Sequence, residues 1–110
     1  MIIQNNSIEN LQDIEKEKQK GPILIWFYAT WCGHCNDMKE EWNKLDNNHP
    51  EGIKLGKIES SNMPNYNKSM GEKELLGYPT LRLYDKGNLI KEYEGERNYE
   101  SIYNFVNSYL

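Results

Sequence analysis

Residues 23–35 read ILIWFYATWCGHC, and this stretch decides the fold of the chain. Its first seven residues are apolar without interruption, which is typical of a β-strand covered on both faces in a central sheet. A cysteine pair follows at positions 32 and 35. Beyond the pair, Met38, Trp42 and Leu45 are spaced for one buried face of a helix. The sequence therefore predicts a central strand that leads through the cysteines into a helix.

The chain has only two cysteines, Cys32 and Cys35. A disulfide that closes so short a loop removes little chain entropy, so structural stapling is a poor explanation for the pair. The first cysteine falls near the N-terminus of the following helix, where unpaired N–H groups and the helix dipole stabilise a thiolate. The second is close enough to resolve a mixed disulfide on the same sulfur. A protonated His34 adds positive charge beside the Cys32 thiolate. The helix N-terminus and this charge both stabilise the reduced form, so they make the disulfide more oxidising.

Periodicity and turn residues predict the remaining elements. We expect a helix with Ser7 as its N-cap and its end at Gly21-Pro22, and a last helix capped by Asn98. The predicted strands cover residues 2–3, 53–58, 80–84 and 89–93, with a loop at 47–52, a short helix at 68–76 and a hairpin turn at 85–88. This order predicts one α/β domain over residues 1–110, with a largely parallel central sheet and a terminal antiparallel hairpin.

The chain is acidic, with a formal net charge of −4 and with lysines that are scattered rather than clustered. This pattern argues against binding to nucleic acid or to an anionic membrane surface. The longest apolar run, residues 23–29, is too short to span a bilayer. Residues 1–6 do not read as a signal peptide and residues 107–110 are not an ER-retention signal, so we expect a cytosolic (cytoplasmic) location.

Three segments make the chain resemble the thioredoxin superfamily, and most of all a catalytic domain of protein disulfide isomerase. They are residues 26–35 (WFYATWCGHC), 77–80 (GYPT) and 93–97 (YEGER). The predicted element order agrees as well, so the resemblance covers nearly the whole chain. It implies a thioredoxin-like α/β fold, with a central mixed sheet flanked by helices, and a protein disulfide oxidoreductase or isomerase.

The resemblance also implies roles for the matching residues. Cys32 is the expected exposed nucleophile, and Cys35 is the buried resolving thiol. Pro79 is expected to be cis, which places the backbone of Tyr78 beside Cys32 to pair with an extended substrate segment. Arg97 matches an arginine that approaches the resolving cysteine. The remaining expected site residues are Gly33 and His34 in the catalytic motif and Trp31 beside the substrate.

Thiol–disulfide exchange of this kind needs no bound cofactor. The expected partners are protein substrates with thiols or disulfides, and a reductase, an oxidase or glutathione that recycles the cysteine pair. We expect a monomer. The direction of exchange stays open, because His34 favours an oxidising pair whereas a cytosolic location favours reduction.

Two positions depart from the family pattern. Trp26 stands where the family usually has a buried acid that moves the proton of the resolving thiol. Lys57 stands where the family has the lysine that pairs with that acid, so we expect it to reach solvent, to find another carboxylate or to lose its charge. Glu40 replaces a proline that usually kinks the helix after the motif, which concerns helix shape more than chemistry.

Three alternatives remain at this stage. The cysteines could be inert buried thiols, or they could bind zinc together with His34 and His49. The second ligand pair of such a zinc site is missing, and a solvated loop explains His49-Pro50 more simply. The chain could also be a non-catalytic binding or chaperone module that holds its partner through the Tyr78-Pro79 surface. The missing acid at Trp26 favours this last alternative.

Overall fold

The computed structural model describes residues 2–3, 7–70, 75 and 77–110, and it is built around a four-stranded mixed sheet. The strands are ordered β4-β2-β5-β6, with bounds Lys54–Glu59, Ile23–Tyr28, Thr80–Asp85 and Asn88–Glu92. β2 pairs parallel with β4 and antiparallel with β5, and β5 pairs antiparallel with β6. The prediction of a largely parallel sheet is therefore wrong: only the β2–α2–β4 connection is a parallel crossover.

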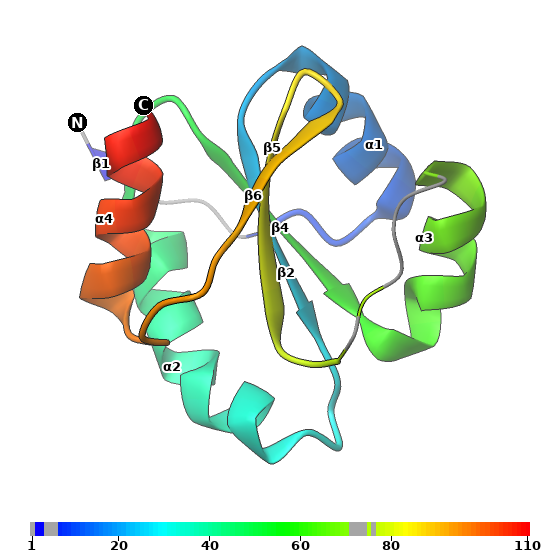
Figure 1. The fold of residues 1–110 in the computed structure, drawn as a ribbon, viewed down its shortest axis with the longest axis horizontal. Coiled ribbons are helices and arrows are strands. Elements are labelled where there is room, and N and C mark those ends of the chain that lie inside the picture. The colour runs from blue at the N-terminus through cyan, green and yellow to red at the C-terminus, as the bar shows by residue number, and fades with distance from the viewer. Residues whose placement is uncertain (1, 4–6, 71–74, 76) are drawn as a thin grey trace.

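The helices cover the two faces of this sheet in pairs (Figure 1). On one face lie α2 (Gly33–Asn47) and α4 (Tyr99–Tyr109). On the other face lie α1 (Leu11–Lys20) and α3 (Met63–Met70), the latter preceded by the short 3-10 helix η1 (Ser60–Asn62). No helix in the described part of the chain is long and apolar enough to cross a membrane.

β2 is the central strand that its apolar sequence predicts. Leu24 and Trp26 point into the core beneath α2 and α4, whereas Ile25 and Phe27 point into the core beneath α1 and α3. Because successive side chains of a strand face opposite sides, a strand buried on both faces needs no polar position. Its carboxyl end leads directly to the cysteine pair.

The first helix begins later than predicted. Asn10, not Ser7, is the N-cap of α1, and its side chain accepts a hydrogen bond from the backbone of Asp13. Ser7 is buried instead: its hydroxyl donates to Asp46, and the indole N–H of Trp42 donates to it at 2.8 Å. The predicted cap of α4 at Asn98 is confirmed.

Two other predicted segments differ from the structure. β1 (Ile2–Ile3) is not an edge of the main sheet but pairs antiparallel with β3 (His49–Pro50), inside the segment predicted to be a loop. His49 is buried there and not solvated. The helix predicted at 68–76 is misplaced: α3 spans Met63–Met70 and shares only residues 68–70 with the prediction, and Leu75 is not helical. Residues 71–74 and 76 lie outside the described residues.

Candidate active site

The cysteine pair lies where β2 turns into α2. The backbone N–H of Cys32 donates to the carbonyl oxygen of Ala29 at 3.2 Å, which closes the turn after the strand. Cys32 is the N-cap of α2, and its Sγ accepts a hydrogen bond from the backbone N–H of Cys35 at 3.1 Å. An N-terminal N–H group aimed at this sulfur favours its anionic form. The predicted position of the first cysteine at the helix start is therefore observed.

The two thiols differ in burial. Both are free, and the exposed fraction is 7% for Cys32 and 2% for Cys35. Burial, and to a smaller extent the neighbouring Cys32, raise the pKa of the Cys35 thiol to about 11, against the opposing effects of the Ala29 backbone and the Arg97 charge. Cys35 is therefore a protonated, enclosed thiol at neutral pH. The expectation that Cys32 is exposed is wrong for this structure: Cys32 is also buried, beneath the Tyr78 loop, and is only slightly more accessible than Cys35.

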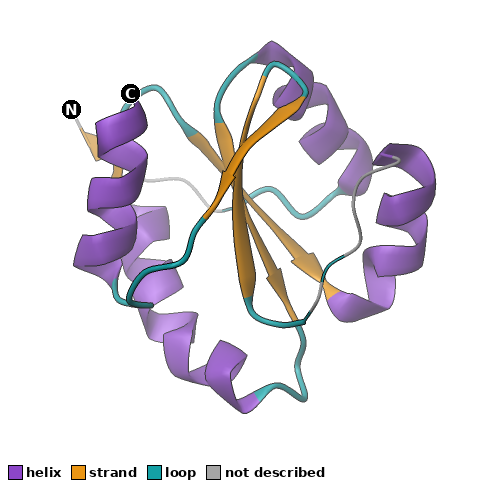
Figure 2. Cartoon of the chain, in the orientation of Figure 1, coloured by secondary structure: helices purple, strands orange, loops and turns teal. Residues whose placement is uncertain are grey.

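The loop before β5 closes over the first cysteine. The Tyr78–Pro79 peptide bond is cis, and the Cys32 thiol donates to the carbonyl oxygen of Tyr78 at 3.6 Å. The loop after β2 and the loop before β5 thus meet at one end of the sheet (Figure 2). The ring of Trp31, 75% exposed, lies edge-on to that of Tyr78 with their centroids 5.9 Å apart. An exposed aromatic surface therefore flanks the thiol.

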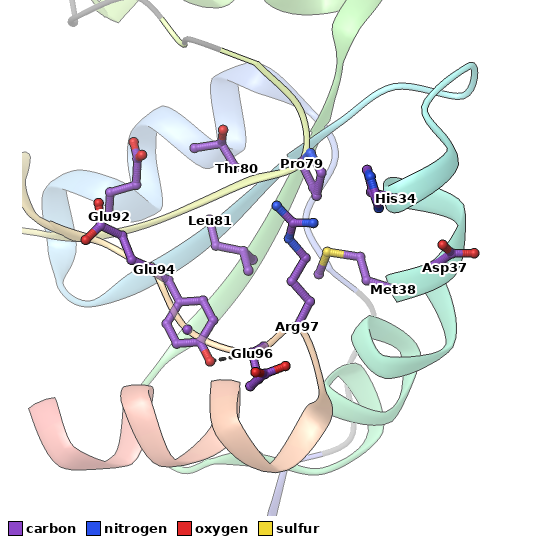
Figure 3. Close-up of a pocket in the computed structure, with 12 residues that line it drawn as sticks. His34, Asp37, Met38, Pro79, Thr80, Leu81, Glu92, Glu94, Glu96 and Arg97 are labelled. Atoms are coloured by element: carbon purple, nitrogen blue, oxygen red, sulfur yellow. Dashed lines mark hydrogen bonds between the residues drawn. The ribbon is translucent and has the colours of Figure 1, made fainter.

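A groove of about 800 Å³ opens next to this loop (Figure 3). His34 lines it from the start of α2, and Pro79 lines it from the loop before β5. The Arg97 side chain extends into it from the segment before α4 and points towards Pro79. The structure thus brings Arg97 to the same site as the cysteine motif, 62 residues after Cys35 in the sequence (97 minus 35).

Gly33 has no steric reason to be glycine in this fold. It opens α2 and is exposed, and a Cβ built on it would meet no atom within 4 Å. Its place among the expected catalytic residues therefore gains no support from packing.

The environment of Trp26 differs from that of a buried acid. Its ring stacks on Tyr28 with centroids 4.5 Å apart and contacts Trp42 at 5.3 Å, and its indole N–H has no hydrogen-bond partner among the described residues. Lys57 pairs with Trp26 across β2 and β4, and its ammonium lies 3.9 Å from Glu9. Of the expected outcomes for Lys57, the structure shows the second: it has found another carboxylate.

Sequence reasoning missed the acidic wall of the groove. Glu92, Glu94 and Glu96 line it from the end of β6 and the loop that follows, and Asp37 lines it from α2. The alternation of glutamates in residues 92–96 was the available signal. Only the fold shows that this segment faces the cysteine motif.

The zinc alternative fails on distance. Cys32 precedes α2 and His49 follows it, so the 15 residues of the helix separate them by roughly 20 Å. Zinc ligands lie about 2 Å from the metal. Among residues 2–3, 7–70, 75 and 77–110, no group of three or more His, Cys, Asp and Glu side chains is arranged to hold a metal ion.

A mixed sheet with helices on both faces and a thiol pair where the central strand leads into a helix together define a thioredoxin-like domain. The chain belongs to the thioredoxin family, whose model matches residues 3–108. The fold class expected from the resemblance is thereby confirmed.

Curated relatives carry the name protein disulfide-isomerase. The chain is 32% identical over 110 residues to "Protein disulfide-isomerase TMX3" of Homo sapiens, covering 96% of this chain and 23% of that protein. It is 36% identical over 88 residues to "Protein disulfide-isomerase" of Hordeum vulgare, covering 76% of this chain and 17% of that protein. The chain thus spans less than a quarter of the length of these two relatives.

Solved structures share the fold at low sequence identity. A thioredoxin from Trypanosoma brucei brucei superposes with a TM-score of 0.75 at 17% identity, covering 97% of this chain and 93% of that one. The Trx4 domain of ERdj5 superposes with a TM-score of 0.71 at 23% identity, covering 96% of both chains. At this level of identity, these similarities establish the fold alone.

Proposed function

We propose that the chain exchanges disulfides with protein substrates through Cys32 and Cys35. In the reducing direction, the Cys32 thiolate attacks one sulfur of a substrate disulfide and bonds to it. The substrate S–S bond breaks, and the other sulfur leaves as a thiolate that takes up a proton. The Cys35 thiol then loses its proton and attacks Cys32 Sγ. The Cys32–Cys35 disulfide forms, the second substrate thiol is released, and two electrons have passed to the substrate; oxidation runs these steps in reverse.

The other site residues have supporting roles in this proposal. The cis-Pro79 loop binds the extended substrate segment beside Cys32, and Trp31 with Tyr78 contacts its apolar side chains. His34 and Arg97 supply positive charge, His34 beside Cys32 and Arg97 towards Cys35. Glutathione, a reductase or an oxidase would recycle the cysteine pair. The proposed activity is that of a protein disulfide oxidoreductase or isomerase, and it needs no bound cofactor. The cytosolic location stays a prediction.

One observation carries the proposal: the Cys35 N–H bonds to Cys32 Sγ at a helix N-terminus, beside a loop that leaves an exposed aromatic surface. This arrangement activates one sulfur and keeps a second within reach. The test is dithiothreitol-dependent reduction of insulin. We expect the chain to accelerate it, and Cys32→Ser and Cys35→Ser each to remove the acceleration while the thermal unfolding of the reduced proteins stays cooperative. No acceleration by the folded chain would contradict the proposal.

A second candidate is a module that holds unfolded chains without catalysis. The exposed Trp31 beside Tyr78, together with the absence of a carboxylate at Trp26, favours it. Such a module would bind reduced insulin chains without accelerating their formation, so the same assay separates the two functions.

A further inference from the structure

The groove lies beside the cysteine motif, next to the loop that contacts Cys32. Cys32 donates to the carbonyl of Tyr78, and the next residue, Pro79, lines the groove together with His34. A polypeptide joined to Cys32 by a disulfide therefore has its flanking residues at the mouth of the groove. The walls that these residues meet come from α2 on one side and from residues 92–97 on the other (Figure 3).

The charge of these walls is mainly negative. One of the groove carboxylates, Glu92, already forms an ion pair with Arg82: the distance between Arg82 Nε and Glu92 Oε1 is 2.9 Å. The other three, those of Asp37, Glu94 and Glu96, take part in no hydrogen bond or ion pair among the described residues. Among the described residues that line the groove, Arg97 is the one permanent cation. An exposed carboxylate without a partner is free to pair with a cation on a bound chain.

The loop that carries two of these carboxylates has a defined shape. The Tyr93 hydroxyl donates to the carbonyl oxygen of Glu96 at 2.5 Å, and the Tyr93 ring lies edge-on to Phe105 at 4.9 Å. A Cβ at Gly95 would collide with the Tyr93 hydroxyl, so the close turn of the loop depends on glycine there. A loop held in this way keeps the backbone positions of Glu94 and Glu96 in place before a partner binds, which lowers the entropy cost of binding.

We propose that this groove selects substrate segments that carry Lys or Arg next to the reactive cysteine, with Glu94 and Glu96 as the specificity-determining residues. The inference rests on the proposed exchange function and names its substrate class. Exposed ion pairs are weak, so two of them should favour a basic over a neutral segment by about fivefold. Repulsion of an acidic segment widens the difference from a basic one to about tenfold.

The test uses three peptide disulfides of equal length, whose cysteine is flanked by Lys, Ser or Glu. Reduced chain is mixed with each probe, and the second-order rate of probe reduction is measured at about 10 mM and about 1 M salt, where the Debye lengths are about 30 and 3 Å. We expect the Lys probe to react about tenfold faster than the Glu probe at low salt, and the ratio to fall towards one at high salt. The double variant Glu94→Gln/Glu96→Gln should reduce the low-salt ratio to about twofold.

The matched control is Glu40→Gln/Glu100→Gln, which removes the same charge from exposed helix positions that do not line the groove. It should keep most of the wild-type ratio, and thermal unfolding should be cooperative for both double variants. A ratio near one in the wild type, a faster Glu probe, or an equal loss in the two double variants would overturn the proposal. If the Ser probe is not reduced at all, the exchange function itself is wrong, and this inference fails with it.

Discussion

The backbone N–H of Cys35 donates a hydrogen bond to Sγ of Cys32 at 3.1 Å. The second residue of the pair thus stabilises negative charge on the first through its backbone, while its own thiol is enclosed. One helix turn therefore gives two identical side chains different surroundings: Cys32 accepts a backbone hydrogen bond beside the Tyr78 loop, and Cys35 is the more deeply buried, protonated thiol.

The first prediction concerns the reactivity of the two thiols. Limiting iodoacetamide at neutral pH should label Cys32 first, because Cys35 is buried and its thiol pKa is raised to about 11. Mass spectrometry of digested protein assigns the label, and chain unfolded in urea, where both thiols should react alike, is the control. Preferential labelling of Cys35 in the folded protein would contradict the assignment.

The same shift predicts how the stability of the reduced protein depends on pH. The unfolded Cys35 thiol ionises near a pKa of about 8.5, before the folded one does. Between these two pKa values the thiol ionises in the unfolded state but stays protonated in the folded state, which favours unfolding. The contribution of Cys35 to the free energy of unfolding is therefore complete below about pH 8.5 and is lost as the pH rises towards 11. Urea unfolding of reduced protein across this range measures it, and Cys35→Ser should lack this part of the pH dependence.

The second prediction is that His34 raises the redox potential. Proline is tolerated in the first helical turn, so His34→Pro should fold and should make the pair more reducing by tens of millivolts, where about 30 mV corresponds to 1.4 kcal/mol. His34→Gln is the control that removes the charge and keeps the backbone N–H. Equilibration with glutathione gives the potentials. Equal potentials for all three proteins would show that the histidine does not tune the pair.

The third prediction concerns the proton of the resolving thiol. Trp26 is 3% exposed and supplies no proton acceptor in the core that also contains Cys35. We expect Cys35 to deprotonate slowly, so that release of the substrate from Cys32 limits turnover. Trp26→Glu should speed the resolution of a preformed mixed disulfide, measured by rapid quenching.

Trp26→Gln is the matched control, because it loses the same aromatic contacts without gaining a titratable group. It should not show the faster resolution of Trp26→Glu. A folded Trp26→Glu protein with unchanged or slower resolution would mean that solvent or another group already accepts the proton.

The fourth prediction concerns a buried polar contact that ties the N-terminal segment to α2. Ser7 accepts a hydrogen bond from the Trp42 indole and donates one to Asp46, whose pKa is raised by burial. Ser7→Ala leaves the Trp42 indole N–H buried without its acceptor and removes one of the two Ser7 hydrogen bonds to Asp46, which should cost about 1 to 3 kcal/mol of unfolding free energy in urea titrations. Ser108→Ala, at an exposed serine, should change it by less than about 0.5 kcal/mol. Equal effects would contradict the account.

The parts of the fold that local sequence controls were predictable. The uninterrupted apolar run fixes β2 as the buried centre of the sheet, and the Asn98 cap follows from short-range hydrogen bonding. Cys32 at the helix start follows from the order of strand, motif and helix. These features depend on neighbours within a few residues, which a single sequence displays.

The features that were missed depend on distant residues. Ser7 looks like a cap, but its partner Asp46 lies 39 positions away. The direction of β5 relative to β2 depends on the path of the intervening chain, which periodicity does not encode. The acidic wall needs residues 92–96 to fold against α2, 55 or more positions after Asp37 (92 minus 37). Long-range contacts decided each case.

The most direct test of the central claim is to trap the mixed disulfide. The Cys35→Ser protein is mixed with a peptide disulfide, and the adduct is located by mass spectrometry after digestion. The account predicts one stable adduct on Cys32, no comparable adduct on the Cys32→Ser protein, and an adduct on the unaltered chain that decays slowly as Cys35 resolves it. Failure of folded Cys35→Ser to form an adduct, or an equally fast adduct on Cys35 in the Cys32→Ser protein, would contradict the claim that Cys32 attacks and Cys35 resolves.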